Sequence, residues 1–139
     1  MIVQYDGTRY NGWQKQGDTD NTIQQKLEAI LEKMAGTPID VHGAGRTDAG
    51  VHAKGQVAQF RMDTDKTPEE IRDYLNEYLP EDIGVISLAV AAPRFHSRFN
   101  ASQKVYQYRI SKDKASHVFD RKYVYEYKGR LDTAAMKVA

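Results

Sequence analysis

Two stretches of the chain space their apolar residues like one face of an α-helix. In the first, residues 22–36, the apolar positions are Ile23, Leu27, Ile30, Leu31 and Met34. In the second, residues 67–80, they are Ile71, Leu75 and Leu79. Each stretch starts with a threonine suited to capping a helix, Thr22 and Thr67, and Gly36 is expected to end the first. Both stretches are therefore predicted to be amphipathic helices.

Six other stretches are predicted to be β-strands, because their apolar residues alternate with polar ones or form short continuous runs. They are residues 1–6, 38–42, 55–62, 83–91, 104–111 and 122–129. A third helix is predicted to begin within residues 131–139. The order of elements is then β-α-β-β-α-β-β-β-α, with mostly short connections. This order is typical of α+β folds, so we predict an antiparallel sheet with helices packed on one face.

The composition places the chain among globular proteins with one compact domain. It has 139 residues, of which 40% are hydrophobic and 28% are charged. No run of about 18 apolar residues predicts a membrane-spanning helix, and the N-terminus lacks the pattern of a secretory signal. The absence of cysteine excludes disulfides, thiolate metal sites and cysteine nucleophiles. We therefore expect a cytoplasmic protein that does not associate with a membrane.

Charge is unevenly distributed, although the net charge of the whole chain is only +1. Residues 1–93 carry 9 Lys and Arg against 15 Asp and Glu, which gives −6. Residues 94–130 carry 10 against 3, which gives +7, and they hold 8 of the 14 aromatic residues. A basic segment rich in aromatics is typical of nucleic-acid binding. A solvated basic face on a pair of amphipathic strands is the alternative explanation.

The segment HGAGRTDAGVHA, residues 42–53, sets charged side chains among glycine and alanine. Gly43, Gly45 and Gly50 would let the backbone turn tightly and approach a large ligand closely. The segment lacks the Gly-Lys-Ser/Thr of a phosphate-binding loop, and no helix follows it. It also lacks the third glycine of a dinucleotide-binding fingerprint. It is therefore predicted to be a ligand-facing loop of another kind, between two strands.

Several chemistries are compatible with this loop. The ligands of a metal site, as in a metal-dependent nuclease, would be His42, Asp48 and His52. Asp48 could instead pair with a distant carboxylate such as Asp6 for acid–base hydrolysis. Asp48 alone could act as nucleophile or base, with Arg46 holding an anion beside it. The structural alternative is that Thr47 and Asp48 only cap a turn through hydrogen bonds to the backbone.

The same loop carries a resemblance to a known family. GAGRTDAGVHA, with GQV closely following, resembles the signature of the tRNA pseudouridine synthases of the TruA type. Other segments of that family are matched in order along nearly the whole chain: YDGTRYNGWQKQ, FHSRFNA and KVYQYRI. The resemblance implies a ferredoxin-like half of the pseudouridine synthase fold. It also implies isomerisation of uridine to pseudouridine in the tRNA anticodon stem-loop, at positions 38 to 40.

The resemblance further implies roles for individual residues. Asp48 matches the catalytic aspartate, and Arg46 matches an arginine that contacts tRNA at the loop. Arg98 matches the arginine that pairs with the aspartate and engages RNA, and Tyr106 matches the tyrosine that stacks on the target base. Further RNA contacts are expected from Phe95, His96, Phe99 and Lys114. On this hypothesis the uridine is flipped out of its stem, and Asp48 attacks the sugar or removes a proton from it.

Members of this family are homodimers that act on tRNA without a cofactor or a catalytic metal, and they consist of two similar α+β halves. The chain resembles the first half only, so we expect residues 1–139 to be the N-terminal catalytic subdomain, with the C-terminal half absent and with weak or no activity alone. A few residues before Met1 are also expected to be missing. The alternative from another class is a non-catalytic RNA-binding module of the same fold, in which Asp48 only forms a turn.

Overall fold

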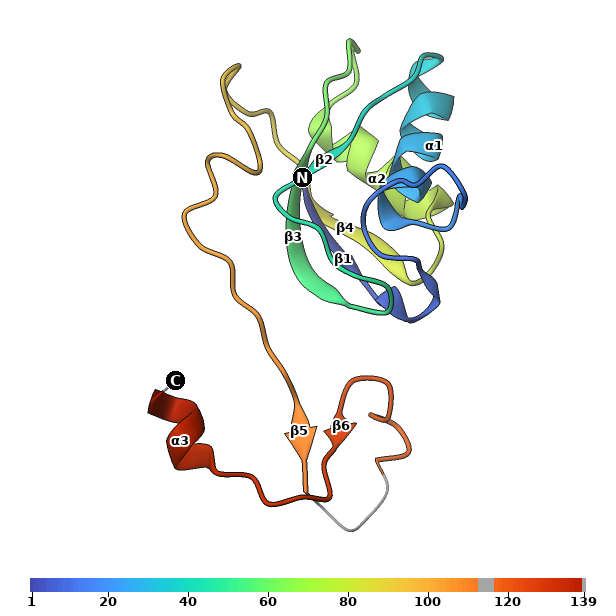
Figure 1. The fold of residues 1–139 in the computed structure, drawn as a ribbon. Coiled ribbons are helices and arrows are strands. Elements are labelled where there is room, and N and C mark those ends of the chain that lie inside the picture. Colours follow the sequence, from blue (N-terminus) through green and yellow to red (C-terminus); the bar gives the residue numbers. More distant parts are fainter. Residues whose placement is uncertain (113–116, 139) are drawn as a thin grey trace. The chain divides into compact units, whose positions relative to one another are not determined.

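The structure is a computed structural model that describes residues 1–112 and 117–138 (Figure 1). The chain divides into two units, Met1–Ser102 and Gln103–Ala139. The first unit contains the predicted ligand-facing loop, and the second contains most of the basic, aromatic-rich segment.

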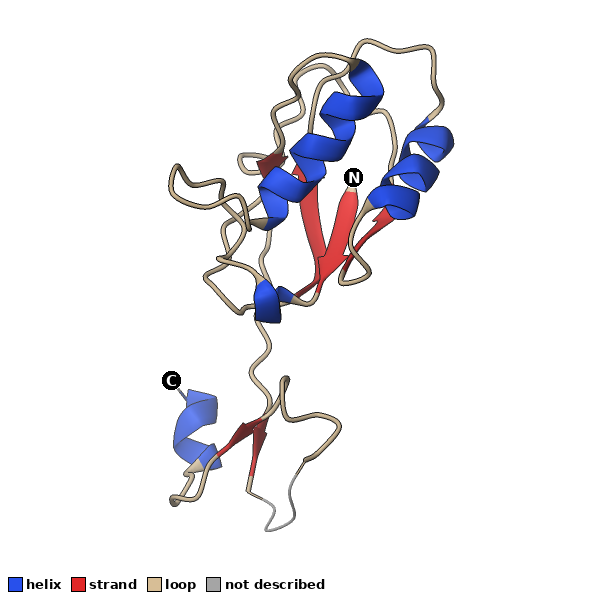
Figure 2. Ribbon diagram, turned by 90° about the vertical axis from the view of Figure 1, so that its right-hand side faces the viewer, coloured by secondary structure: helices blue, strands red, loops and turns tan. Residues whose placement is uncertain are grey.

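The first unit is built on a four-stranded antiparallel sheet in the order β2-β3-β1-β4. Its strands are β1 (Ile2–Tyr5), β2 (His42–Gly43), β3 (Ala53–Gln59) and β4 (Ile83–Ser87). Its helices are α1 (Ile23–Ala35), α2 (Pro68–Tyr78) and the short 3-10 helix η1 (Gly7–Arg9). Helices α1 and α2 lie on the same face of the sheet (Figure 2). The predicted α+β class, an antiparallel sheet with helices on one face, is confirmed.

Both long helices begin and end close to where the sequence predicts. The Thr22 side chain accepts a hydrogen bond from Gln25 N, and Gly36 ends α1 in the left-handed region with φ of 71°. Thr67 and Glu70 form a reciprocal capping box at the start of α2. These contacts satisfy backbone groups that helix ends leave unpaired. Within the described part of the chain, no helix has the length and hydropathy that a membrane crossing requires.

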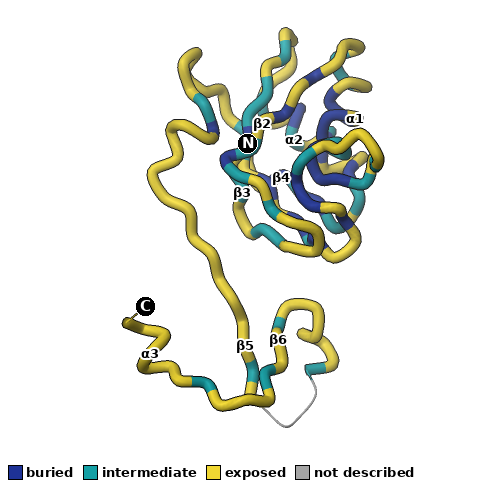
Figure 3. The backbone as a smooth tube through the Cα atoms, in the orientation of Figure 1, coloured by how far each residue is buried: buried dark blue, intermediate teal, exposed yellow. Residues whose placement is uncertain are grey.

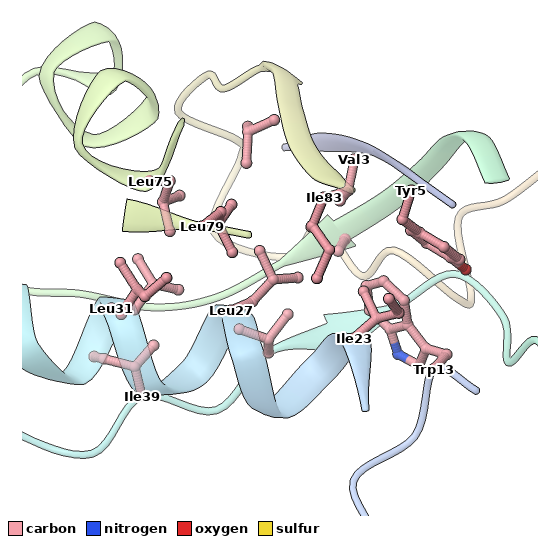
Figure 4. Close-up of a cluster of buried hydrophobic side chains, with 14 of the residues drawn as sticks. Val3, Tyr5, Trp13, Ile23, Leu27, Leu31, Ile39, Leu75, Leu79 and Ile83 are labelled. Atoms are coloured by element: carbon pink, nitrogen blue, oxygen red, sulfur yellow. The ribbon is translucent and has the colours of Figure 1, made fainter. Parts of the chain in front are cut away.

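The hydrophobic core lies between the sheet and the two helices (Figures 3 and 4). Its largest fully buried side chains include Trp13, Ile23, Leu27, Leu31 and Leu75. Each fully buried aliphatic side chain contributes about 1.5–3 kcal/mol, so this cluster is the main source of stability in the first unit. Trp13 is only 1% exposed and belongs to this cluster, so it anchors its loop to the core.

Several strands are shorter than the sequence predicts. The strand predicted over residues 38–42 is reduced to β2, because Val41 donates its backbone N–H to the Glu28 carboxylate, 3.0 Å away, and not to a neighbouring strand. Strand β4 ends at Ser87 although the apolar run continues, because its partner β1 begins at Ile2, which lies opposite Ser87. Apolar alternation predicts which side chains are buried, but a strand also needs a neighbouring backbone to pair with.

The second unit contains β5 (Ile110–Ser111), β6 (Tyr125–Glu126) and α3 (Thr133–Val138). The strands predicted over residues 104–111 and 122–129 are therefore wrong for most of their length. The two short strands also pair in parallel, against the antiparallel prediction. No described residue of this unit is buried (Figure 3). Tyr106 and Tyr108 alternate with polar residues as in a strand, but among the described residues no neighbouring strand pairs with their backbone. The strand therefore stays short, because a strand needs a partner for its backbone hydrogen bonds.

Asp82, just before β4, connects η1 to the sheet. Its carboxylate accepts hydrogen bonds from Arg9 Nη2, at 2.7 Å, and from the Tyr10 hydroxyl. Burial raises the pKa of this carboxyl, but the hydrogen bonds from Tyr10 and Arg9 and the charge of Arg9 outweigh burial, so the pKa lies below its ordinary value. The resulting stabilisation is present above the carboxyl's unfolded pKa of about 3.9, and it is lost as the pH falls through the lower folded pKa.

We expect Asp82→Asn to lower the free energy of unfolding at pH 7 by about 1 kcal/mol, a typical net value for a hydrogen bond. Urea unfolding at a series of pH values measures this difference, which should narrow below about pH 4 as the parent carboxylate becomes protonated. Asp18→Asn, which changes an exposed carboxylate on a loop, is the control and should leave the stability unchanged. A difference of equal size at pH 7 and pH 2 would contradict the assigned cause.

Candidate active site

The connection between β2 and β3 carries the motif residues, and its two ends are held close together. Because β2 and β3 are neighbours in the sheet, residues 44–52 close a hairpin, and we call them the motif loop. Ala44 N donates to Val57 O at 2.7 Å, and Gln56 Nε2 donates to Gly45 O at 2.5 Å. The loop thus starts from a rigid base, which suits a site whose groups must be held in place.

A second loop, residues 7–16, lies against the motif loop, and we call it the support loop. Three hydrogen bonds join the two loops: Trp13 N to Thr47 O (3.0 Å), Gly50 N to Tyr10 O (3.2 Å) and Gly7 N to His52 Nδ1 (3.1 Å). They hold the motif loop at three points along its length. The motif loop is therefore fixed both from the sheet and from the support loop.

Two glycines let the support loop approach this closely. At Gly12, φ is +92° and an added Cβ would lie 2.5 Å from Thr47 O. At Gly7, an added Cβ would lie 2.0 Å from Val51 O. Both distances are shorter than real Cβ contacts, so only glycine fits at these positions. The two loops are therefore packed backbone against backbone.

Asp48 is exposed on the motif loop. Its backbone O accepts a hydrogen bond from Val51 N at 3.2 Å, but the carboxylate has no partner among the described residues. The Thr47 hydroxyl bonds to Tyr5 Oη, at 2.9 Å, and not to the loop backbone. The alternative in which these two side chains cap a turn is therefore not supported. Arg46, also exposed, likewise lacks a partner within the described part of the chain.

The FHSRF segment, residues 95–99, docks on the strands from which the motif loop extends. Ser97 is 2% exposed, and its Oγ donates to His42 O at 2.8 Å. Its backbone N donates to Gln59 Oε1 at 2.6 Å. Because His42 and Gln59 face each other across β2 and β3, Ser97 fixes the segment at the base of the motif loop. The sequence gives no local signal for this anchor, which sequence reasoning missed.

Side chains beside Ser97 form an aromatic row of His42, His96 and Phe99, in which His42 and Phe99 are exposed and His96 is half-buried. The centre of the His96 ring lies 4.3 Å from that of Phe99 and 6.2 Å from that of His42. Arg98 Cζ lies 6.0 Å from the centre of the Phe99 ring, and Phe99 is 77% exposed. Exposed rings beside a guanidinium are suited to stacking on the bases of single-stranded nucleic acid.

The structure brings only some of the predicted site residues together. Asp48 and Arg46 share the motif loop, and Arg98 lies in the segment that docks at the base of that loop. Among the described residues, no ion pair joins Arg98 to Asp48. Tyr106 belongs to the second unit, where its side chain is 68% exposed. Lys114 lies outside the described residues.

The histidines of the metal alternative have other neighbours. His42 lies beside His96, whereas His52 Nδ1 lies 3.0 Å from Asp6 Oδ1. Nowhere in the described ranges do three His, Cys, Asp or Glu side chains gather as metal ligands would. Within the described ranges, the three residues of the metal alternative therefore do not gather at one point.

A buried polar network beneath the support loop was not predicted from the sequence. The Glu28 carboxylate, 5% exposed as a residue, bonds to Gln24 Nε2 at 2.7 Å, Val41 N at 3.0 Å and Lys15 Nζ at 3.1 Å. It thereby joins α1 to the support loop and to the residues that lead into β2. The one signal of this network in the sequence is the polar pair Gln24 and Glu28, which lie four residues apart beside the apolar face of the helix.

Comparison with known proteins gives an independent result. The sequence profile of a family described as tRNA pseudouridine synthase matches residues 1–100. A Bacillus sp. (strain KSM-64) protein named tRNA pseudouridine synthase A is 50% identical over 123 residues, which make up 88% of this chain and 50% of that protein.

Two further relatives match the chain over its full length. The protein named tRNA pseudouridine synthase A 2 of Bacillus cereus is 42% identical, and that named tRNA pseudouridine synthase A 1 of Clostridium tetani is 50% identical. Each match covers 100% of this chain and 57% of the relative. The chain therefore spans about half the length of the curated relatives it matches.

Proposed function

This chain belongs to the tRNA pseudouridine synthase family, and from that premise we propose that it is the N-terminal catalytic subdomain of an enzyme that isomerises uridine to pseudouridine in tRNA. The observation that carries the proposal is the exposed Asp48 carboxylate, which has no partner among the described residues although its loop is fixed on two sides. A carboxylate that is held in place but left free is suited to a nucleophilic step.

In the proposed reaction Asp48 acts on the sugar of the target uridine. The carboxylate attacks C1′, and the C1′–N1 bond breaks with its electron pair leaving on N1 of uracil. The uracil rotates and C5 bonds to C1′, which displaces the carboxylate. The proton on C5 then leaves to a base or to water, and N1 takes up a proton from water. In the other route the carboxylate removes the proton on C2′, the C1′=C2′ double bond of a glycal forms, and the C1′–N1 bond breaks with its electron pair leaving on N1. Because a uridine in a stem is paired and stacked, it is first flipped out.

The RNA contacts in this proposal come from basic and aromatic side chains. Arg46, beside Asp48, and Arg98 bind the RNA near the flipped nucleotide, since a guanidinium binds phosphate through two hydrogen bonds. Tyr106 provides a ring on which the detached uracil stacks. Further RNA contacts are assigned to Phe95, His96, Phe99 and Lys114. The support for these assignments is the +7 charge of residues 94–130 and the exposure of most of the side chains, namely Arg46, Phe95, Arg98, Phe99 and Tyr106.

For the complete protein we also propose the substrate region, the oligomeric state and the location in the cell. Its substrate region is the anticodon stem-loop, with uridines 38 to 40 as targets, and it acts as a homodimer in the cytoplasm. The other half of the protein supplies the second wall of the active site. Residues 1–139 alone are therefore expected to turn over tRNA weakly or not at all.

Release of tritium from tRNA labelled at C5 of uracil tests the proposed function. The complete protein is expected to release tritium, because the C5 hydrogen leaves when C5 bonds to C1′. Transcripts that keep a single uridine at position 38, 39 or 40 identify the targets. Binding of tRNA without release of tritium would contradict the proposal and would leave an RNA-binding module.

Phe99→Ala is expected to weaken tRNA binding by about tenfold, because stacking on an aromatic ring contributes about 1–3 kcal/mol per base. Filter binding at one fixed salt concentration measures the change. Tyr78→Ala, which removes an exposed ring from α2, is the matched control and should bind tRNA like the parent. Equal affinities of the parent and Phe99→Ala would exclude the aromatic row from the RNA-binding surface.

A further inference from the structure

The position of the Asp48 carboxylate depends on how the backbone of the motif loop is held. Thr47, the residue before Asp48, is held by hydrogen bonds through both its backbone and its side chain. Its O accepts a hydrogen bond from Trp13 N at 3.0 Å, and its Oγ1 lies 2.9 Å from Tyr5 Oη. In the described structure, the Tyr5–Thr47 bond is the one side-chain hydrogen bond that joins the sheet to residues 46–48.

Tyr5 is a rigid support for this bond. It ends β1, a central strand of the sheet, and it is 5% exposed. Its ring lies beside that of Trp13, with ring centres 6.0 Å apart (Figure 4). Burial raises the pKa of the Tyr5 hydroxyl, although the hydrogen bond with Thr47 opposes this, so the phenol stays neutral. Near neutral pH the Tyr5 hydroxyl therefore keeps its proton and can form the hydrogen bond with Thr47.

The hydroxyl has a role that packing does not explain. A phenylalanine would fill the same space in the core, and a buried hydroxyl is unfavourable unless it is hydrogen-bonded. The partner of this hydroxyl is the residue directly before Asp48. The contact thus connects an inner strand of the sheet to the residue that directly precedes Asp48.

We propose that Tyr5 is a positioning residue, which fixes the Asp48 carboxylate for attack by holding Thr47. The inference rests on the proposed function, because it assumes that Asp48 reacts with the sugar. Displacement of a reacting group by about 1 Å lowers a rate by up to about 100-fold, so a single bond at this place affects turnover. Binding of tRNA is expected to be kept, because the two hydroxyls bond to each other and the proposed function assigns an RNA contact to neither.

The test compares Tyr5→Phe, Thr47→Val and the double variant in the complete protein. Each single variant removes one hydroxyl and keeps the shape of the side chain. Each is expected to lower kcat for tritium release by about tenfold, with KM and tRNA affinity unchanged. The double variant should be no slower than the slower single variant, since both changes remove the same bond. Thr47→Ser keeps the hydroxyl and is expected to keep the parent kcat.

Three results would overturn the proposal: losses that multiply in the double variant, a parental kcat in folded Tyr5→Phe, or equal losses in Thr47→Ser and Thr47→Val. A merely structural role of Tyr5 would lower the thermal midpoint and leave kcat unchanged at temperatures where the variant is folded. If Tyr5→Phe does not fold, the two Thr47 variants decide the question.

Failure of this inference is distinguishable from failure of the proposed function. If the function is wrong, Asp48→Asn keeps its turnover, or the parent shows none. If only the inference is wrong, Asp48→Asn is inactive while folded Tyr5→Phe works at the parent rate.

Discussion

Asp48→Asn is expected to lower the turnover of tRNA by about 1,000-fold or more, as loss of a nucleophile does in other enzymes. The amide keeps the shape of the side chain but cannot attack C1′. Because the carboxylate has no partner among the described residues, its loss should leave both the fold and the tRNA affinity unchanged. Tritium release gives kcat, and filter binding in the same buffer gives Kd.

Asp40→Asn is the matched control for this prediction. Asp40 is also an exposed carboxylate, and it lies shortly before β2, outside the motif loop. The control variant should bind and turn over tRNA like the parent. Parental turnover in Asp48→Asn would contradict the catalytic role of Asp48. So would a loss of tRNA binding as large as the loss of turnover, because it would assign Asp48 to the binding surface.

Gly7→Ala is expected to have the largest effect on stability, lowering the free energy of unfolding by about 3 kcal/mol. The added Cβ would lie 2.0 Å from Val51 O, which is backbone and has no flexible side chain to move aside. The support loop must therefore separate from the motif loop, which also displaces Asp48. Urea unfolding measures the stability, and tritium release is expected to fall in the folded fraction as well.

Gly17→Ala is the control for the added methyl group. Gly17 lies just beyond the support loop, and a Cβ there would have no heavy atom within 4 Å. This variant should unfold at the parent denaturant concentration and keep the parent turnover. Equal stability of Gly7→Ala and Gly17→Ala would mean that the two loops are not packed as described.

The helices and the motif loop could be predicted from sequence because their signals are local. The capping threonines Thr22 and Thr67 lie within three residues of the groups that they bond, and the apolar spacing of each helix repeats over a few turns. The motif loop is likewise a continuous segment, so its exposure and its place between two strands follow from its own residues. The resemblance to a known family added the proposed role of Asp48.

The contacts that complete the site could not be predicted, because they join distant parts of the chain. The Tyr5–Thr47 bond spans 42 residues, and the bond from Ser97 to His42 spans 55. The strand predicted over residues 104–111 failed for a related reason, since alternation does not specify which backbone will pair with it. These long-range contacts and strand pairings depend on how the chain folds in three dimensions, and the pattern of neighbouring residues does not specify them.

The most direct measurement is the nucleoside content of tRNA after incubation with the complete protein. Unmodified tRNA would be treated in parallel with the parent and with Asp48→Asn, digested to nucleosides, and separated by chromatography. The account predicts that pseudouridine appears with the parent in proportion to the uridine lost, and that none appears with the variant. Pseudouridine formed equally by both proteins, or by neither while tRNA is bound, would contradict it.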